Sequence, residues 1–371
     1  MSVLAAKKKV AVIGGGVIGV SIATHLLRAG AEVVLITESQ PASGASSHSL
    51  SWLNSAGERS LAYHALRMAG IDRYRTLFSH QPECEWLRFD GALCWSLDET
   101  ASRARHAYET TLGYDSKLTG PDSVDRFTPN IAHEAMKESA IFNPGEGWVS
   151  LPHLIAFLLE EFKNGGGSLV TQAGKAQVMT DASGAAVGVA TEKAGEFTAD
   201  SVVVACGPYT PDVVKPLGVT LPNGSPVAML VTSEPLDHGL KAVLNTPRAA
   251  VRPNPGQTLV MDHDWYESQF TQDERGNYQI PQAVVDELMA ESSKLLAGQP
   301  ALKAAGWRAG LKPIPGDGNP VLGELQKVPG CYVAFTHSGA TLALIVGELL
   351  AGEILSGEKH PLLAEFRAER F

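Results

Sequence analysis

The sequence is poor in cysteine and has no clustered positive charge, and both absences narrow its possible functions. The four cysteines form no Cys-x-x-Cys pair and no Cys/His group at metal-ligand spacing, so we expect no metal site and a reducing, cytoplasmic compartment. The formal net charge is -10 and the only basic run is Lys7 to Lys9. Because a nucleic-acid-binding surface needs clustered Lys and Arg, we expect no nucleic-acid partner.

Long hydrophobic runs are also scarce. The apolar stretch 10–27 follows three lysines, but it contains at least three glycines and runs directly into a second apolar segment, Val33 to Ile36. A signal peptide would have a polar cleavage region at that point. We find no other stretch of the roughly 18 to 20 apolar residues that a membrane span requires, so no transmembrane segment is expected.

Glycine is the residue in excess. The chain has 371 residues, of which 44% are hydrophobic and 19% charged, which is typical of a globular protein of about two or three domains. Its 37 glycines are one residue in ten, against an average of about 7%. They show neither the period of collagen nor the Gly/Ser runs of a linker, so particular sites must need a tight backbone.

The first forty residues predict a strand, a helix and a second strand. Lys9 to Ile13 is a short apolar run rich in valine, Val17 to Arg28 has helical periodicity, and Glu32 to Thr37 is again apolar and β-branched. Such a βαβ unit of about 30 residues is the usual context of a dinucleotide-binding fingerprint.

That fingerprint is present between the first strand and the helix. Gly14, Gly16 and Gly19 occupy the three glycine positions of G-x-G-x-x-G, and Glu38 ends the second strand. The first glycine permits a tight turn, the second lets a pyrophosphate approach the backbone, and the third lets helix and strand pack closely. A carboxylate at the end of the second strand can accept hydrogen bonds from a ribose diol. The pattern predicts binding of NAD or FAD.

Segments far downstream favour FAD. Two more buried strands ending in glycine are expected, within 197–207 and 331–339, and the stretches 317–323 and 328–339 are followed by an apolar helix. These C-terminal stretches resemble the D-amino-acid oxidase superfamily, whose members include glycine oxidases and sarcosine oxidases. The resemblance extends over most of the chain and implies an FAD-dependent oxidoreductase.

The resemblance also implies an α/β fold with two domains. A Rossmann-like FAD-binding domain would be assembled from the discontinuous segments 1–84, 146–224 and 311–371. An α+β substrate-binding domain containing an antiparallel sheet would comprise 85–145 and 225–310, and this sheet would cover the flavin.

The family pattern assigns cofactor contacts residue by residue. The fingerprint glycines would hold the pyrophosphate, and Glu38 the adenosine ribose. Ser46 and Ser47 would lie beside the pyrophosphate and the flavin edge, and the alternative is that they are ordinary residues of a solvated loop. Gly339, at the start of the last helix, would stabilise negative charge on the flavin pyrimidine. The full set expected at FAD is Gly14, Gly16, Val17, Ile18, Gly19, Glu38, Ser46, Ser47, His48, Val178, Gly207, His337, Ser338, Gly339, Ala340 and Thr341.

Many members of the superfamily have Arg or another residue at the position of His48. The segment from Ser43 to His48 is similar to that of dimethylglycine and sarcosine dehydrogenases, in which a histidine is bonded covalently to the flavin. A histidine close to the flavin without a bond is the favoured alternative, and covalent attachment stays open.

A cation is expected to bind the carboxylate of the substrate. Relatives often have Arg in a G-x-R-P segment, and this chain has Lys312 at that position. The alternative interpretation is that Lys312 is an ordinary surface lysine. Arg252 on a predicted strand of the covering sheet is a second candidate. His263 and Tyr266 follow a neighbouring strand and either face the substrate or pack the sheet. With His48, these residues form the candidate catalytic set.

The resemblance implies oxidation of the C–N bond of a small amine or amino acid, of the D-amino acid, glycine or N-methyl type. Hydride transfer to flavin N5 would give an imine that hydrolyses. The alternatives are an FAD-dependent 2-hydroxy-acid dehydrogenase and the flavin subunit of a hetero-oligomeric amine oxidase. The expected partners are the substrate, an electron acceptor that is oxygen or another compound, and other chains in a homo- or hetero-oligomer. The strand 257–261 lacks the lysine that sarcosine oxidases use with oxygen, which favours a dehydrogenase.

Overall fold

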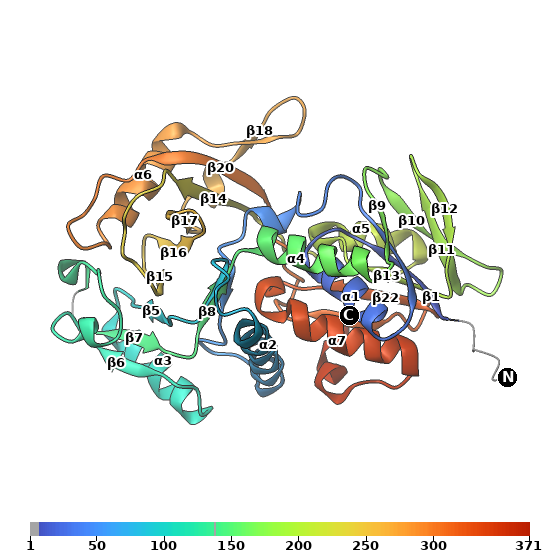
Figure 1. Ribbon diagram of the computed structural model, residues 1–371, viewed down its shortest axis with the longest axis horizontal. Coiled ribbons are helices and arrows are strands. Elements are labelled where there is room, and N and C mark those ends of the chain that lie inside the picture. Colours follow the sequence, from blue (N-terminus) through green and yellow to red (C-terminus); the bar gives the residue numbers. More distant parts are fainter. Residues whose placement is uncertain (1–6, 137–138) are drawn as a thin grey trace.

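The computed structural model describes residues 7–136 and 139–371, which form two halves, each built around a large β-sheet (Figure 1). One half, on the right of Figure 1, contains β1, β13 and β22 with the helices α1 and α7. The other half, on the left, contains the strands β14 to β17 and β5 to β7. The predicted α/β fold with a separate, mainly antiparallel sheet is confirmed.

The right-hand half has a six-stranded sheet in the order β21-β22-β13-β1-β2-β9. All its neighbouring strands pair in parallel except β21 and β22, which are antiparallel. The central strands are buried along nearly their whole length, as expected for parallel strands covered on both faces. The strands are β1 (Lys9–Ile13), β2 (Glu32–Ile36), β9 (Ser168–Val170), β13 (Ser201–Val204), β21 (Val321–Glu324) and β22 (Cys331–Phe335).

Four helices pack on or beside this sheet, and two of them approach each other very closely. A Cβ on Gly347 of α7 would lie 2.9 Å from the carbonyl carbon of Ser21 and 2.7 Å from Nδ1 of His25, both on α1. A glycine at 347 therefore brings the two helix backbones together. The helices are α1 (Val17–Arg28), α2 (Leu61–His80), α4 (Leu151–Asn164) and α7 (Gly339–Ser356).

The helix α7 corrects one expectation from the sequence. By length and composition alone it is apolar enough to cross a membrane, although we expected no such stretch beyond the N-terminal region. In the structure 67% of it is buried, and it packs against α1 and α2. Its position as a core helix accounts for its apolar composition.

A small three-stranded sheet covers the other face of the six-stranded sheet. It consists of β10 (Ala176–Thr180), β11 (Ala186–Thr191) and β12 (Gly195–Thr198), with α5 (Thr210–Val214) nearby. We expected one buried strand over 197–207, but β12 and β13 are separate strands in different sheets. Asp200, at the break, accepts a hydrogen bond from the backbone N–H of Lys9 at 2.7 Å, which holds the chain as it turns from one sheet into the other.

The left-hand half has an eight-stranded sheet in the order β20-β14-β17-β16-β15-β5-β7-β6. It is antiparallel apart from the pair β15 and β5. The helices α3 (Glu99–Thr111) and α6 (Gln282–Ser293) flank it. The strands are β5 (Ala92–Cys94), β6 (Lys117–Thr119), β7 (Ala140–Asn143), β14 (Val227–Ser233), β15 (Val243–Asn245), β16 (Ala250–Asn254), β17 (Thr258–Asp262) and β20 (Ala304–Leu311).

Short elements lie between the two halves. A three-stranded sheet of β3 (Trp52–Leu53), β8 (Gly147–Val149) and β4 (Leu87–Arg88) lies near the middle of Figure 1, and the 3-10 turn η1 (Ala45–Ser47) precedes it. A hairpin of β18 (Thr271–Gln272) and β19 (Tyr278–Gln279) projects from the left-hand half. The exact domain boundaries stay a prediction.

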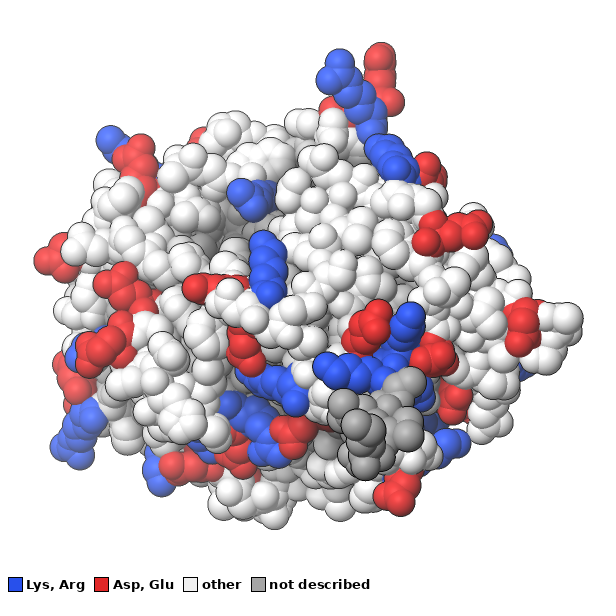
Figure 2. All heavy atoms as spheres, turned by 45° about the vertical axis from the view of Figure 1, so that its right-hand side comes forward, with Lys and Arg blue, Asp and Glu red and all other residues white. Residues whose placement is uncertain are grey.

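Charged side chains are mixed over the surface shown in Figure 2. Lys and Arg alternate there with Asp and Glu, and the described part of this face carries no broad basic patch. This distribution agrees with the formal net charge of -10.

Candidate functional site

The glycine fingerprint forms a tight turn at the carboxyl end of β1. Gly14 has φ +123°, and a Cβ at this position would collide with the carbonyl group of Ala205. A Cβ on Gly19 would collide with the carbonyl oxygen of Gly14. At Gly16 the nearest atom to such a Cβ is Oγ of Ser46 at 3.5 Å, so the backbone at the start of α1 is free to receive a ligand.

Ser46 and Ser47 lie against this helix start. The Oγ of Ser46 is buried and accepts a hydrogen bond from the backbone N–H of Val17 at 3.1 Å. The hydroxyl of Ser47 donates to the carbonyl oxygen of Gly44 at 2.9 Å and closes the η1 turn. Ser46 is therefore placed where a group bound at the N-terminus of α1 would meet it.

The N-terminus of α7 lies beside the first turn of α1. A Cβ on Gly339 would be 3.7 Å from Cγ1 of Ile18. Thr341 donates a hydrogen bond to the carbonyl oxygen of Trp52 at 3.3 Å, and the carbonyl oxygen of Ala340 accepts one from Tyr74 at 2.5 Å. Two helix N-termini thus meet at one place, and because the N–H groups of a first turn have no partner within their own helix, this place is favourable for anionic groups.

A buried arginine supports the start of α7, and the sequence analysis missed it. Arg67 is only 3% exposed and donates to the carbonyl oxygen and to Oδ1 of Asn54, at 2.8 and 2.9 Å, and to Oγ of Ser338. Tyr63 and Ser338 share a further hydrogen bond of 2.6 Å. The one available signal was an arginine next to Leu66 on the apolar side of a predicted helix.

His337 lies two residues before α7, and Lys312 is near enough for its charge to lower the pKa of His337. The ring of His337 is accessible to solvent but surrounded by protein on most sides, and this burial lowers its pKa to about 4, with smaller contributions from the charges of Lys312, Arg67 and Arg59. Lys312 Nζ lies 3.4 Å from Oε1 of Glu267, and both side chains are partly exposed. Lys312 directly follows β20 of the left-hand sheet and His337 precedes α7, so the two residues come from different halves of the molecule.

Arg252 has a different environment. It is 2% exposed, its guanidinium stacks on Trp148 at 4.9 Å, and it donates to the carbonyl oxygens of Leu50 and Pro253 and to Oδ1 of Asn254. Burial lowers its pKa to about 9. Among the residues described, no carboxylate pairs with it, so its contacts join the loop after η1 to the left-hand sheet.

His263 and Tyr266 lie in the turn after β17, where their contacts are structural. Nε2 of His263 is 3.1 Å from the carbonyl oxygen of Thr246. Tyr266 is fully buried, and its hydroxyl accepts from the backbone N–H of His263 and donates to Asp262 at 2.9 Å, with the carbonyl oxygen of Met229 3.2 Å away. These contacts favour the packing interpretation over a direct substrate contact.

The remaining predicted cofactor residues lie after β2, after β13 and within β10. Glu38 is exposed just after β2, and its charge raises the pKa of the Cys206 thiol, although burial is the larger cause. Gly207 follows with φ +56°. Val178 lies in the middle of β10 with its side chain partly buried against the core.

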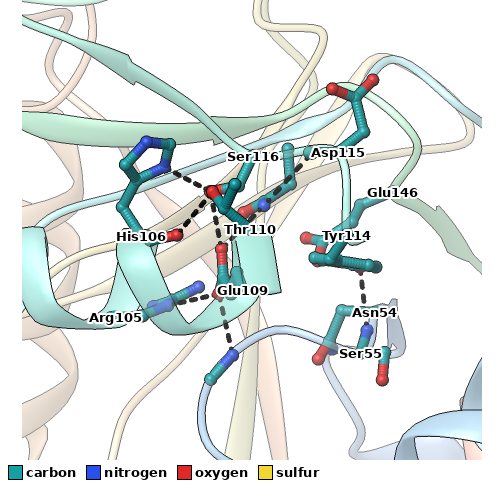
Figure 3. A network of polar contacts seen from close by, with 12 residues as sticks. Asn54, Ser55, Arg105, His106, Glu109, Thr110, Tyr114, Asp115, Ser116 and Glu146 are labelled. Carbon is teal, nitrogen blue, oxygen red and sulfur yellow. Dashed lines mark hydrogen bonds and ion pairs between the residues drawn. The ribbon is translucent and has the colours of Figure 1, made fainter. Parts of the chain in front are cut away.

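A buried polar network lies behind the site (Figure 3). Glu146 accepts hydrogen bonds from Tyr114 and from Trp52 Nε1, the latter at 2.7 Å. Burial raises the pKa of Glu146 to about 8, even though both donors and a nearby arginine lower it. The next carboxylate, Glu109, is bonded by Arg105 at 2.7 Å. The sequence analysis did not find this network.

The comparison with protein families identifies the group to which the chain belongs. It matches the family model described as DAO, FAD dependent oxidoreductase, over residues 9–353. The chain is a member of this FAD-dependent oxidoreductase family.

Relatives of the DAO family act on amino acids. The chain is 26% identical to glycine oxidase of Geobacillus kaustophilus (strain HTA426), over 97% of this chain and 96% of the relative. It is 25% identical to D-amino acid dehydrogenase of Methylobacterium sp. (strain 4-46), over 98% of each. The crystal structure of glycine oxidase from Geobacillus kaustophilus superimposes with a TM-score of 0.81 at 21% identity, covering 98% of this chain and 100% of that one, and shows the shared fold.

The residues of this DAO-family chain fit FAD. The glycine turn at α1 leaves an open backbone next to the Ser46 hydroxyl, and the second helix N-terminus at Gly339 lies alongside it. A long dinucleotide with a pyrophosphate and a ring system that becomes anionic on reduction suits two such helix starts. The expected family, fold class and cofactor are confirmed, and the roles of single residues stay predictions.

His48 is held against the left-hand sheet. It is 7% exposed, and a Cβ on Gly310 of β20 would lie 2.8 Å from its Nε2. Within the described chain Nε2 has no hydrogen-bond partner. Burial lowers the pKa of His48, which a hydrogen bond with the backbone of Leu311 partly offsets, so the ring is neutral at pH 7.

Proposed function

We propose that this enzyme oxidises the C–N bond of a small amino acid and that Lys312 binds the carboxylate of the substrate. The observation that carries the proposal is the position of His337 two residues before α7, the helix start that suits the flavin, with Lys312 near enough for its charge to lower the pKa of His337. The similarity to a glycine oxidase and a D-amino acid dehydrogenase supports the same substrate class.

Bound FAD supplies the acceptor for the hydride that leaves the substrate carbon. The chain itself has to position the substrate. The ammonium group of Lys312 attracts the carboxylate, and Glu267 at 3.4 Å orients that ammonium group. The N–H groups at the start of α7 stabilise negative charge beside them.

The proton balance of the reaction involves His337. The amine reacts as its free base: as the hydride leaves carbon, the nitrogen lone pair forms the C=N bond and the nitrogen releases a proton. Because its pKa is about 4, His337 is neutral at pH 7 and can accept a hydrogen bond from the amine without repelling it. Water then hydrolyses the imine to a carbonyl compound.

The proposal is tested by anaerobic titration of the purified holoenzyme with single amines. The panel contains glycine, sarcosine and both enantiomers of alanine and proline, and the loss of flavin absorbance is recorded. We expect at least one amino acid to bleach the flavin. Bleaching by 2-hydroxy acids alone would assign the alternative dehydrogenase activity, and activity only with a co-purified second chain would assign a subunit role.

The electron acceptor is tested with the reduced enzyme. Strand β17 contains no lysine, so on the comparison with sarcosine oxidases we propose a dehydrogenase that passes electrons to an acceptor other than oxygen. After anaerobic reduction we expect slow reoxidation by air and faster reoxidation by a quinone or a dye. Fast reoxidation by air would assign an oxidase instead.

A further inference from the structure

We propose a second anion-binding subsite centred on Arg59, which makes amines bearing two carboxylates the preferred substrates. This inference rests on the proposed amino-acid oxidation and specifies its substrate class. The two carboxylates belong either to one carbon chain, as in an amino dicarboxylic acid, or to both sides of the nitrogen, as in an N-carboxyalkyl amino acid.

The guanidinium groups of two arginines pack on one aromatic ring next to the start of α7. The guanidinium carbons of Arg59 and Arg67 lie 5.6 and 5.4 Å from the centre of the Tyr63 ring. Tyr63 in turn shares a hydrogen bond of 2.6 Å with Ser338, the residue before α7. Tyr63 therefore fixes two positive charges beside the start of that helix.

Only one of these arginines has its hydrogen bonds satisfied. All three nitrogens of the Arg67 guanidinium donate to Asn54 or Ser338. By contrast, Nε of Arg59 is buried without a hydrogen-bond partner in the part of the chain that the structure describes. No ion pair is formed by either arginine within that part. A buried guanidinium donor with no acceptor is unfavourable unless a ligand supplies one.

Among the residues described, no carboxylate forms an ion pair with Arg59, although the charge of Glu146 contributes a minor rise in the pKa of Arg59. Glu109 is already bonded by Arg105, the backbone of Gly57, Ser116 and Asn143. Glu146 accepts hydrogen bonds from Tyr114 and Trp52, and its raised pKa of about 8 leaves it largely protonated at pH 7. The positive charge at Arg59 is thus available to an anion from outside the chain.

Lys312 provides the other cation of the pair. It follows β20 of the left-hand half, whereas Arg59 lies just before α2 and is connected through the Tyr63 ring to Ser338, the neighbour of His337. The charges of both cations also lower the pKa of His337. One carboxylate of the substrate binds Lys312 and the other binds Arg59, so that the amine between them lies near His337. A substrate with one carboxylate would leave Arg59 unpaired.

The test compares Arg59→Gln with the wild-type holoenzyme on matched substrates. The acidic set is D- and L-aspartate, D- and L-glutamate and iminodiacetate, and the neutral set is glycine, sarcosine and D- and L-alanine. In the wild type we expect kcat/KM to be higher for the acidic set. In Arg59→Gln the acidic-to-neutral ratio of kcat/KM should fall by about 10- to 100-fold, as for the loss of a charged hydrogen bond. Preference for iminodiacetate over aspartate or glutamate would assign the N-carboxyalkyl arrangement.

The control is Arg103→Gln, which changes an exposed arginine on α3 that pairs with Glu99 and should leave the ratio unchanged. A second measurement avoids turnover: malonate and succinate are titrated into the oxidised enzyme, and the shift of the flavin spectrum gives Kd. We expect Kd to rise at least about tenfold in Arg59→Gln. An unchanged ratio with an unchanged Kd overturns the subsite. If no amine reduces the flavin but diacid binding depends on Arg59, the subsite stands and the proposed function fails.

Discussion

Lys312 shows how much the type of a single cation matters at this site. Its ammonium group is a compact charge on a flexible chain, whereas arginine presents a planar fork that binds a carboxylate through two parallel hydrogen bonds. Glu267, at 3.4 Å, limits the freedom of the ammonium group. The geometry of carboxylate binding therefore depends on this ion pair as well as on the charge.

The first prediction concerns Lys312. Replacing it by methionine keeps the length of the side chain but removes the charge, so KM for the amino acid should rise about 10- to 100-fold. FAD content, measured by visible absorbance, should stay at the wild-type level because the side chain lies in the other half of the molecule. Lys312→Arg is the matched control and should retain much of the affinity. An unchanged KM in Lys312→Met would leave the lysine without a role in binding.

The second prediction concerns covalent attachment. Nε2 of His48 has no hydrogen-bond partner among the described residues but is buried against β20, and the ring also bonds to the backbone of Leu311, so we expect no bond to a flavin methyl group. Acid precipitation should release all FAD into the supernatant, with a colourless pellet. A yellow pellet from the wild type that becomes colourless in His48→Ala would instead establish the covalent bond.

At the residue scale, the sequence predicted the local motifs well. Gly14 and Gly19 were found because their spacing reflects a turn formed by neighbouring residues. Arg67 was missed because its partner Ser338 is 271 positions away, and no local pattern encodes that pairing. Tyr266 was taken as a site candidate from its place after a strand, but its direction into the core depends on strands elsewhere in the sheet.

Helix α7 contains two glycines in opposite environments, which gives the third prediction. Gly352 is exposed with nothing near it, so Gly352→Ala should stabilise the helix by about 0.5–1 kcal/mol. Gly347 faces α1, and the added methyl of Gly347→Ala would press against Ser21 and His25, which should destabilise the protein by about 1–3 kcal/mol. Urea unfolding of both variants measures the difference. Equal effects would contradict the close helix contact.

The polar network around Glu146, next to β3 and β8, gives the fourth prediction, which concerns the pH dependence of the free energy of unfolding. Glu146 has a raised pKa of about 8 in the folded state and an ordinary pKa in the unfolded state. Between those values the folded state binds more protons, so this group makes the free energy of unfolding fall as pH rises from about 4.5 to 8. In Glu146→Gln this slope should be smaller than in the wild type.

The measurement is urea unfolding at pH 5.5, 7 and 8.5. Asp115→Asn is the control, because it removes an exposed carboxylate close to the same network, and its pH dependence should follow the wild type. Parallel curves for wild type and Glu146→Gln would show that Glu146 is ionised across this range.

At the element scale, helices were easier to predict than strands. The helical stretches 17–28 and 339–356 have the periodicity or apolar length that defines a helix within one segment. The single strand expected over 197–207 was wrong, since β12 and β13 belong to different sheets. A strand's identity depends on its hydrogen-bonded neighbours, and those are distant in the sequence.

For the whole molecule, bound FAD should stabilise the folded state by contacting segments that are distant in the sequence, and this gives the fifth prediction. Its expected contacts come from 14–19, 46–48 and 337–341, so the cofactor stabilises only the folded chain. At a free concentration 100 times Kd, binding adds about 2.7 kcal/mol to stability, which corresponds to roughly 3 °C in Tm for a chain of this size. Thermal unfolding of the apoprotein with and without FAD measures it. NAD is the control and should cause no shift.

The division into two halves was visible from the sequence mainly through the family resemblance. The eight-stranded sheet takes its strands from 92–143 and 227–311, on either side of strands that belong to the other half. Composition and periodicity do not encode this order, because both halves contain similar apolar strands. The parallel pairing of β15 with β5 was not expected at all.

The pairing of β15 with β5 has a consequence for how the protein is made. Because β5 (Ala92–Cys94) leaves the ribosome well before β15 (Val243–Asn245) is synthesised, the strands β5, β6 and β7 form a small sheet whose free edge has no partner for a long stretch of translation. Unpaired strand edges of this kind promote aggregation, because strands of other chains can pair with them. The nascent chain therefore exposes this edge of β5 while the strands between β7 and β15 are being made, and pairing with β15 covers it.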